Sequence, residues 1–379
     1  NVTFNNINST GTITAVEVHT TFVSSSIAVA SGSNNFGDAT DDHHSFTGSL
    51  SVSASLSVTG STTVDGTFSA QGISLSNNDA GSGNTIFGKN AGASLDAGSN
   101  NNVFIGENVS DAAMNDAVEN TAVGYSALSS LTTGDENTMI GRLAGRDIGS
   151  GAGNVMIGSA AGYQAEEDVA QCVIIGRGAF NGVATDAANG TVAIGYGAGA
   201  AITSGAANVA IGYQAGDALN IGGDNVAIGT GALTTEDVGD RAVAVGTNAL
   251  FSQNSDSDNE DSLNIGIGHA AGYYNVTGQN NTYIGGFAGT GASGQSHSGN
   301  TGLGSRALQS VTTGGSNVVV GNQAGDTITD GGENVIVGDG AGQTTTSVAN
   351  AVIIGRGAAQ NGNITTDANG TVAVGYKSL

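Results

Sequence analysis

The chain has 379 residues, with 64 glycines, no proline, no tryptophan and a formal net charge of −24. Average usage would give roughly 27 glycines and 19 prolines, so the composition excludes an ordinary helical enzyme, a collagen and a charge-driven disordered chain. The acidic balance excludes nucleic acid as a partner, and no run of 18 apolar residues exists that would insert into a membrane. Because proline lacks the N–H that a β-ladder uses, its absence favours a chain hydrogen-bonded to neighbouring strands.

The N-terminal part is predicted to contain two segments without the later repeat. Residues 1–46 hold stretches rich in Val, Thr and Ile, which predict strands of unclear fold. In residues 47–80, serine alternates with apolar residues, and glycine then recurs every six residues, at Gly60, Gly66 and Gly72. Such hexads are too short to enclose a core within one chain. They predict a shaft in which several chains intertwine as a β-prism.

A short repeat fills the third segment, residues 81–379. The phrase Asn-Val-Ala-Ile-Gly stands at residues 208–212 and 225–229, and relatives of it occur along the segment. Its last glycine marks seventeen units: Gly88, Gly106, Gly124, Gly141, Gly158, Gly176, Gly195, Gly212, Gly229, Gly246, Gly268, Gly285, Gly304, Gly321, Gly338, Gly355 and Gly375. The commonest spacing is 17 residues, and the longest, 22, separates Gly246 from Gly268. This period predicts the coils of a solenoid.

The residues before each glycine predict a short strand. The residue directly before it is large and apolar in all seventeen units, and Val, Ile or Thr usually stands two residues earlier. We expect the residue before the glycine to face the core of the coil. The varied residue between these two would lie on the opposite face, buried against sister chains. Its large examples are Phe104, Met139, Met156, Tyr283, Ile336 and Ile353.

Two further slots predict the corners of the coil. Alanine stands three residues after the glycine in 15 units, which indicates a crowded bend. Asparagine opens 12 of the 17 units. Because asparagine tolerates the left-handed conformation and bonds to nearby backbone, it suits a corner, and repetition in every coil predicts an amide ladder along the axis.

The fold class predicted is all-β, an elongated parallel β-solenoid (β-roll) of about 17-residue coils. So thin a coil leaves little interior, so we expect self-association, with a parallel homotrimer as the assembly. A longer duplication is also visible, because residues 120–134 match residues 300–314, ten units later. Seventeen coils spaced by about 4.8 Å would form a rod of roughly 80 Å.

No catalytic, cofactor-binding or metal-binding residue is predicted, and no cofactor. The acidic residues 252–262 could hold Ca²⁺, but they lack EF-hand spacing, so a solvated loop is favoured. Residues 41–44, Asp-Asp-His-His, could bind a transition metal, although a polar turn is favoured. Cys172 occupies an asparagine slot and is interpreted as an inert small residue, with interchain reactivity as the alternative.

Enzymatic activity has little support in the sequence. The chain has no GxSxG, HExxH or phosphate-binding loop, and its glycines follow the repeat. The pair Glu166 and Glu167 could serve a glycosidase, but the scarcity of aromatic residues argues against a sugar groove. Four tyrosines share the slot after the glycine, where packing at a corner is favoured over an exposed stripe for glycans: Tyr125, Tyr196, Tyr213 and Tyr376.

The Asn-x-Ala-Ile-Gly phrase followed by alanine resembles the head repeats of trimeric autotransporter adhesins, the YadA-like family. That resemblance implies a left-handed parallel β-roll in a parallel homotrimer. The variants NTAVGYSAL and NVAIGYQAG are similar to repeats in tail fibres of tailed phages, and the hexads to fibre shafts. The resemblance covers about residues 84–379, and the period is longer than that of the adhesin heads. The chain starts without Met and stops inside a unit, so we expect a segment of a longer polypeptide.

The function predicted is that of a non-enzymatic structural fibre, extracellular or on a virion. It would form a rigid shaft that projects a binding end towards a host or a surface. One alternative is an adhesin whose repeat face binds a receptor or a host-surface glycan directly. Another is a polysaccharide-degrading spike.

Overall fold

The structure is a computed structural model. It describes residue 10 and residues 81–379, except 167, 186–187, 259, 362–363 and 365. The segments 1–46 and 47–80, with the predicted β-prism and the Asp-Asp-His-His stretch, therefore lie outside the described residues apart from residue 10. The chain divides into two units, Asn1–Gln71 and Gly72–Leu379, and the repeat forms the second.

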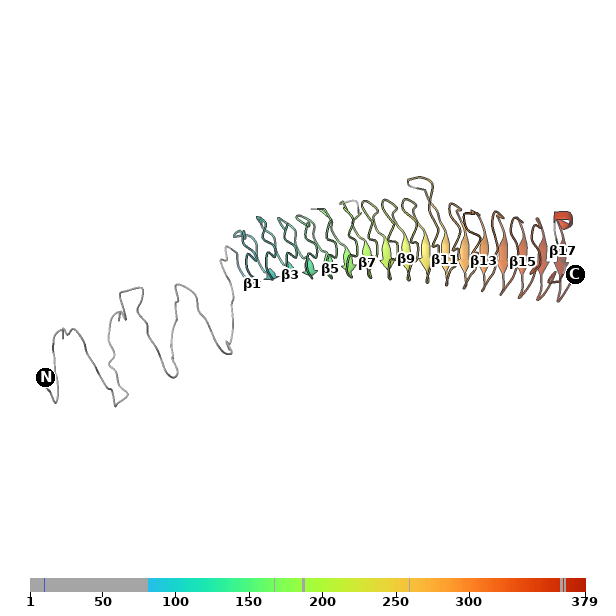
Figure 1. Ribbon diagram of the computed structural model, residues 1–379, viewed down its shortest axis with the longest axis horizontal. Helices are drawn as coiled ribbons and strands as arrows, with labels where there is room; N and C mark the ends of the chain where they lie inside the picture. Colours follow the sequence, from blue (N-terminus) through green and yellow to red (C-terminus); the bar gives the residue numbers. More distant parts are fainter. Residues whose placement is uncertain are drawn as a thin grey trace, which may run out of the picture. The chain divides into compact units, whose positions relative to one another are not determined.

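The repeat folds as the predicted parallel β-solenoid. Each unit contributes one three-residue strand, and the strands form a single seventeen-stranded parallel sheet along the rod (Figure 1). The strands are β1 (Thr85–Phe87), β2 (Val103–Ile105), β3 (Thr121–Val123), β4 (Thr138–Ile140), β5 (Val155–Ile157), β6 (Val173–Ile175), β7 (Val192–Ile194), β8 (Val209–Ile211), β9 (Val226–Ile228), β10 (Val243–Val245), β11 (Ile265–Ile267), β12 (Thr282–Ile284), β13 (Thr301–Leu303), β14 (Val318–Val320), β15 (Val335–Val337), β16 (Val352–Ile354) and β17 (Val372–Val374). A 3₁₀ turn, η2 (Thr366–Ala368), precedes β17.

Equivalent slots of successive coils stack directly on one another. Between β8 and β9, for example, Val209 pairs with Val226, Ala210 with Ala227 and Ile211 with Ile228. The corners are also joined along the axis, since the Gly212 N–H donates to the Ile194 carbonyl of the preceding coil and the Gly216 N–H to the Ala232 carbonyl of the following coil. Backbone donors are thus used around the whole coil, which explains why the repeat contains no proline.

The predicted orientation of the strands was wrong. The middle residue of each strand points into the coil, and the two flanking residues point outwards. Phe104, Met139, Met156, Ile336 and Ile353 are fully buried inside their own coil and not against sister chains. The physical reason is that a three-residue strand can send either one or two side chains inwards, and this narrow coil has room for one.

The largest residue of the middle slot is accommodated by small neighbours along the axis. Tyr283 is fully buried, and the equivalent residues of the adjacent coils are glycines, Gly266 and Gly302. A Cβ atom on Gly302 would lie 3.0 Å from the Tyr283 ring. The Tyr283 ring therefore takes space that the two glycines leave, whereas elsewhere large residues stack on one another, as Met156 does between Met139 and Ile174. Variation in this slot reflects close packing rather than exposure.

The repeat glycine is required by both its conformation and its surroundings. Gly285 has a φ of 136°, which side-chain-bearing residues rarely adopt. A Cβ atom at this position would lie 2.5 Å from the carbonyl oxygen of Gly304, the equivalent glycine of the next coil. The backbones of successive coils therefore approach closely at this slot.

The asparagine slot forms the predicted ladder. The side-chain oxygen of Asn137 accepts the backbone N–H of Asn154 at 3.1 Å, and its Nδ2 donates to the carbonyl of Gly151 at 2.9 Å. The left-handed residue at this corner is the one before the asparagine, for example Glu136 with a φ of 57°. The proposed conformational role of asparagine was therefore wrong, whereas its role as a backbone partner is confirmed.

The ladder is interrupted where other residues take the slot, at Cys172, Thr191, Ala242, Ala351 and Thr371. After Ala242 the 22-residue interval supplies a substitute, because Asn264 Nδ2 donates to Gln253 Oε1 at 2.6 Å.

The alanine slot is confirmed as a crowded corner. All of its alanines are buried, and most are completely inaccessible, as at Ala144 and Ala232.

A histidine lies in the core. His297 is 2% exposed, and its Nδ1 lies 2.8 Å from the Tyr283 hydroxyl. Burial lowers the pKa of His297 from 6.5 to about 4. The imidazole is therefore neutral in the folded protein under conditions in which an unfolded chain would protonate it.

This histidine predicts a loss of stability in mild acid. Because the folded-state pKa is depressed, the unfolded chain binds the extra proton between pH 6.5 and pH 4, and stability falls as pH decreases through that window, by up to about 3 kcal/mol. The thermal midpoint of the unmodified chain should therefore fall further between pH 7 and pH 4 than that of His297→Gln. Equal falls in the two proteins would contradict this assignment.

Candidate functional site

The chemically varied side chains gather on one face of the solenoid, directly after the repeat glycine. This face, called the post-glycine face below, comprises the first, second and fifth residues after each glycine. The hollows considered below lie on it, since their walls come from these slots. One hollow, of about 330 Å³, is lined by Tyr273, Phe287 and neighbouring residues. Its rings pack mainly on one another, as Tyr273 does on Phe251 at 4.9 Å.

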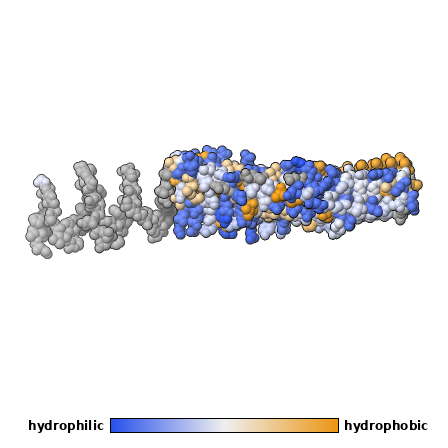
Figure 2. Space-filling view, turned by 90° about the horizontal axis from the view of Figure 1, so that it is seen from above, coloured by the Kyte–Doolittle hydropathy of each residue, from blue (hydrophilic) through white to orange (hydrophobic). Residues whose placement is uncertain are grey.

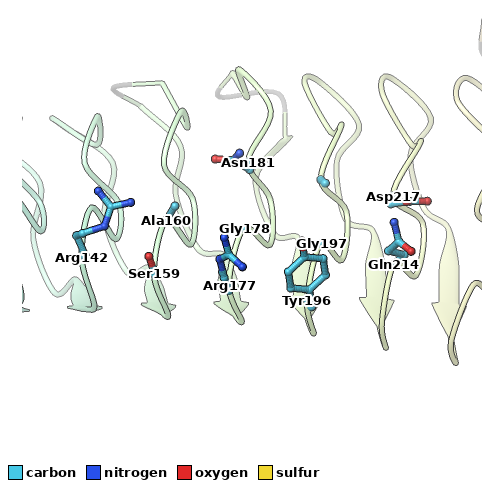
Figure 3. A pocket seen from close by; sticks show the side chains of 11 residues that line it. Arg142, Ser159, Ala160, Arg177, Gly178, Asn181, Tyr196, Gly197, Gln214 and Asp217 are labelled. Carbon is cyan, nitrogen blue, oxygen red and sulfur yellow. The ribbon is translucent and has the colours of Figure 1, made fainter.

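The hollow with the most varied polar chemistry has a volume of about 380 Å³ and spans the coils of β4 to β8 (Figure 3). Arg142, Ser159, Arg177 and Tyr196 occupy the same slot in four successive coils and follow one another along it. The slots beside them hold small residues, which leave the space open: Ala160, Gly178, Gly197 and Ala200.

The two arginines of this hollow have no carboxylate partner within 4 Å in the described part of the chain. Four of the eight basic residues do have one: Lys89 pairs with Glu107, Arg146 with Asp147, Arg241 with Asp224 and Asp261, and Arg356 with Asp339. Arg177 lies over the Tyr196 ring at 5.8 Å, a distance at which the ring contributes little. Positive charge is thus left unpaired in a chain that is otherwise strongly acidic.

Two oxygen acceptors in the same hollow also lack partners. Asn181 Oδ1 and Asp217 Oδ1 are inaccessible to solvent and accept no hydrogen bond. Burial raises the pKa of the Asp217 carboxyl. Buried acceptors without donors are rare in folded proteins, because each costs free energy comparable to a lost hydrogen bond. Because the two oxygens have no accessible surface, the open part of the hollow presents the two arginines and not these acceptors.

The acidic insertion is held by contacts within the protein. The residues 252–262 protrude from the rod between β10 and β11 (Figure 1). Two of their carboxylates contact other groups of the protein: Glu260 Oε2 accepts the Asp256 N–H at 2.9 Å, and Asp261 pairs with Arg241. In the ranges that the structure describes, no group of three or more His, Cys, Asp or Glu could hold a metal ion.

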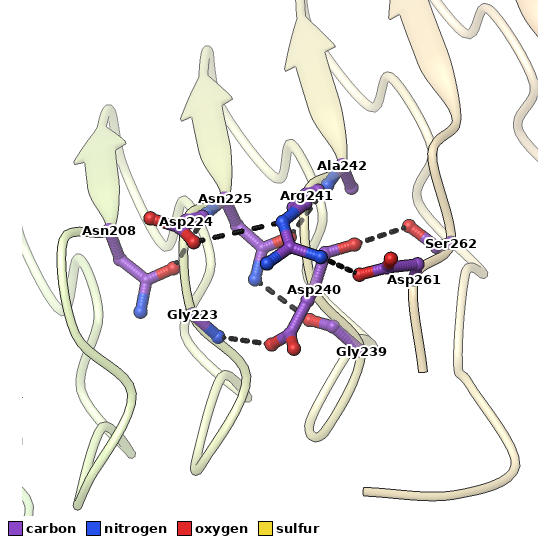
Figure 4. A network of polar contacts seen from close by, with 10 residues as sticks. All are labelled: Asn208, Gly223, Asp224, Asn225, Gly239, Asp240, Arg241, Ala242, Asp261 and Ser262. Atoms are coloured by element: carbon purple, nitrogen blue, oxygen red, sulfur yellow. Dashed lines mark hydrogen bonds and ion pairs between the residues drawn. The ribbon is translucent and has the colours of Figure 1, made fainter. Parts of the chain in front are cut away.

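Polar contacts fasten this insertion to the preceding coils (Figure 4). Arg241 reaches Asp224 at 3.9 Å on one side and Asp261 on the other. Asp240 Oδ1 accepts the Gly223 N–H at 2.7 Å, and Ser262 Oγ donates to the Asp240 carbonyl at 3.1 Å. The network keeps the coils in register across the longest interval.

The other residues considered in the sequence fall at separate places. Cys172 is completely buried, and burial raises the pKa of its thiol, in keeping with an inert residue. Glu166 is exposed, and its neighbour 167 lies outside the described residues. The four tyrosines after the glycine are 49 to 66% exposed, so they form a surface slot and not a packed corner.

Within the described ranges, no helix has the length and hydrophobicity needed to span a membrane.

Sequence reasoning missed Arg142, Arg177, Asn181 and Asp217. The available signal was the alignment of slots, because two unpaired arginines occur in the first slot after the glycine within three coils. No protein-family model, curated protein or solved structure matches this chain. The geometry of its two faces is therefore the basis for assigning a function.

Proposed function

We propose that the chain is a non-enzymatic structural fibre protein whose solenoid is a rigid shaft, extracellular or borne on a virion. The observation that carries this proposal is the outer face of the sheet. The two outward positions of all seventeen strands hold only Val, Ile, Leu, Phe and Thr. A chain with a net charge of −24 thus keeps one face of its whole rod free of charge.

The size of this outer sheet face matches that of a protein interface. With three residues per strand and seventeen coils, it measures roughly 10 by 80 Å, or on the order of 800 Å². That is about what one partner contributes to a stable interface, and more than monomers usually expose as one apolar patch. Many of its side chains remain accessible, such as Ile284 at 37%, Leu303 at 44% and Val335 at 38%. Hydrophobic residues form a visible row over the C-terminal coils (Figure 2).

The occupant we propose for this face is the same face of further copies of the chain. Parallel copies in register bring identical apolar columns together along the rod, and the resemblance to YadA-like head repeats favours three copies. The assembly buries an apolar face that a single thin coil leaves in water. The free energy gained by this burial offsets the conformational entropy that the chain loses on folding, which the small core of one coil does not offset alone.

Charge placed on the outer sheet face should dissociate the assembly. In the variant Ile284→Asp/Leu303→Asp, two carboxylates per chain enter the interface without partners, and burying them is costly. We expect single chains by size-exclusion chromatography with light scattering. The matched control, Gly286→Asp/Ser305→Asp, adds the same charge two residues later on the post-glycine face and should leave the mass unchanged. Assembly of both variants would contradict the proposed interface.

Removal of one ten-coil block tests the function as a spacer. Deletion of residues 125–304 joins Gly124 to Ser305, which stands in the slot of Tyr125, so the repeat continues in phase. The shaft should stay folded and become shorter by about 48 Å in electron micrographs, because ten coils at about 4.8 Å are lost. Particles of unchanged length, or particles that are not elongated, would refute a spacer role.

A further inference from the structure

We infer that residues 286–299, the return segment between β12 and β13, open from the solenoid in mild acid through protonation of His297. This conformational switch goes beyond the shaft function, and it does not rest on self-association, because the contacts that carry it lie within one chain. Three features of the region carry it: a polar stretch of the core, the weak anchoring of the return segment and the surroundings of its histidine.

The core of the solenoid is polar over four successive coils. The residue seven positions after the repeat glycine is aliphatic and buried in the two coils before them and the two coils after them: Ile202, Leu219, Val311 and Ile328. In the coils of β9, β10 and β11 the same position holds three completely buried polar residues, Glu236, Gln253 and Asn275. Gln253 Nε2 has no hydrogen-bond partner among the described residues. Because buried polar groups without partners cost free energy, these coils hold together less strongly than their neighbours.

The fourth of these coils is closed by the return segment, which has few buried contacts. The hydrophobic core divides just before it, between Leu250 and Ala271. Five of the fourteen residues of the segment are glycines, which lose the most conformational freedom on folding. Between residues 291 and 299, His297 is the one buried residue. Segments with few buried contacts open at the lowest cost, so the imidazole is the main anchor of this one.

The site of His297 cannot hold a second proton. The Tyr283 hydroxyl lies 2.8 Å from Nδ1 and donates to Asn281 Oδ1 at 3.2 Å. Nε2 is inaccessible to solvent and has no partner in the described part of the chain. Protonation places a hydrogen on both ring nitrogens, which would leave a charged N–H donor buried without an acceptor. The closed segment therefore excludes the imidazolium form.

No neighbouring charge offsets this exclusion. In its own coil, His297 contacts one titratable side chain, Tyr283, and burial raises the pKa of that phenol, so it stays neutral. The titratable side chains of the two adjacent coils, those of β11 and β13, reach the surface: His269, Tyr273, Tyr274 and Arg306. Glu260 of the acidic insertion contacts Gln279. Burial, and not a nearby charge, lowers the pKa of His297 to about 4.

Opening of the return segment also loosens the contacts between coils. The His297 N–H donates to Asn275 Oδ1 at 3.1 Å, and Asn281 Nδ2 donates to the His297 carbonyl at 2.7 Å. Displacement of His297 breaks both bonds and removes a backbone partner from Asn281, a member of the asparagine ladder. The shaft thus has one coil that yields in acid before the others.

Hydrogen–deuterium exchange of the full chain, measured by mass spectrometry at pH 7 and pH 5, tests the inference. Each exchange rate is divided by the intrinsic rate of the peptide at that pH. With a pKa of 6.5 in the open segment and about 4 in the closed one, the open fraction rises about twentyfold from pH 7 to pH 5. Protection of the amides of residues 295–300 should fall by that factor. Residues 125–136, between β3 and β4, contain no histidine and should keep their protection.

Two histidine variants assign the effect to one side chain. His297→Gln places a neutral side chain in the core, so the protection of its return segment should no longer depend on pH. His269→Gln is the matched control, because it removes an exposed histidine from the preceding coil and should keep the full pH dependence.

Equal protection of the return segment at pH 7 and pH 5 would overturn the inference. An equal fall in residues 125–136 would show general unfolding in acid and would also overturn it, as would a full pH dependence in His297→Gln. If that variant does not fold, the comparison of the two segments in the unmodified chain still decides. Light scattering on the same samples reports the assembly separately, so failure of the shaft proposal and failure of this one are distinguishable.

Discussion

Replacement of Gly285 by alanine is expected to lower the free energy of unfolding by about 3–5 kcal/mol or to prevent folding. The residue has a φ of 136°, and the new Cβ would lie 2.5 Å from the Gly304 carbonyl oxygen. The backbone of the next coil cannot move away without breaking its own ladder bonds, so strain and overpacking add together. Chemical denaturation followed by circular dichroism measures the loss.

The adjacent residue supplies the control. A Cβ atom added to Gly286 would meet no other atom within 4 Å, and the φ of this glycine lies outside the left-handed region. Gly286→Ala should therefore leave stability unchanged or raise it by up to about 1 kcal/mol, since alanine reduces the freedom of the unfolded chain. Similar stability of Gly285→Ala and Gly286→Ala would mean that successive coils do not approach at the repeat glycine.

Replacement of Asn137 by alanine is the second large effect. The substitution leaves the Asn154 N–H and the Gly151 carbonyl without partners, and it removes the Asn154 Nδ2 contact at 3.0 Å. Each unsatisfied buried group costs about 1–3 kcal/mol, so we expect a loss of about 3–5 kcal/mol in the free energy of unfolding.

Replacement of an exposed asparagine is the control. It shows whether the loss of stability comes from the ladder position or from replacing any asparagine by alanine. Asn322 contacts Asp339 at the surface, with 3.1 Å between side-chain atoms, and Asn322→Ala should change stability by less than about 0.5 kcal/mol. Equal losses in the two variants would show that the ladder contributes nothing specific. The same denaturation measurement applies to both.

The repeat slots with a single chemical requirement could be predicted from the sequence. Glycine recurs where no Cβ fits, alanine where the chain bends tightly, and asparagine where one side chain must serve two backbone groups. These requirements are local and repeat in every coil. The strands, their parallel order and the coil length follow from them directly.

The orientation of the strands could not be predicted in the same way. The apolar residue before the glycine is constant, which was interpreted as burial, whereas the buried middle slot ranges from Gly302 to Tyr283. The size of Tyr283 is matched by glycines in the coils above and below it, and a single unit does not show that relation. The constancy of the outward slots instead indicates a shared surface requirement, for which we propose contact with other copies.

The hollow between Arg142 and Tyr196 was missed for a related reason. Arg142 and Arg177 are 35 positions apart and unremarkable in sequence, yet two coils bring them to one hollow. The absence of a carboxylate partner for both arginines depends on side-chain positions that no motif records. The two faces of the solenoid thus differ in chemistry, with a uniform apolar sheet face and a varied polar face.

Sedimentation equilibrium of the unmodified full chain, at several loading concentrations, tests the central claim most directly. If the uncharged outer face of the sheet joins copies of the chain into a shaft, the measured mass will be three times that of one chain and independent of concentration. A mass equal to one chain at every concentration would contradict the proposed assembly.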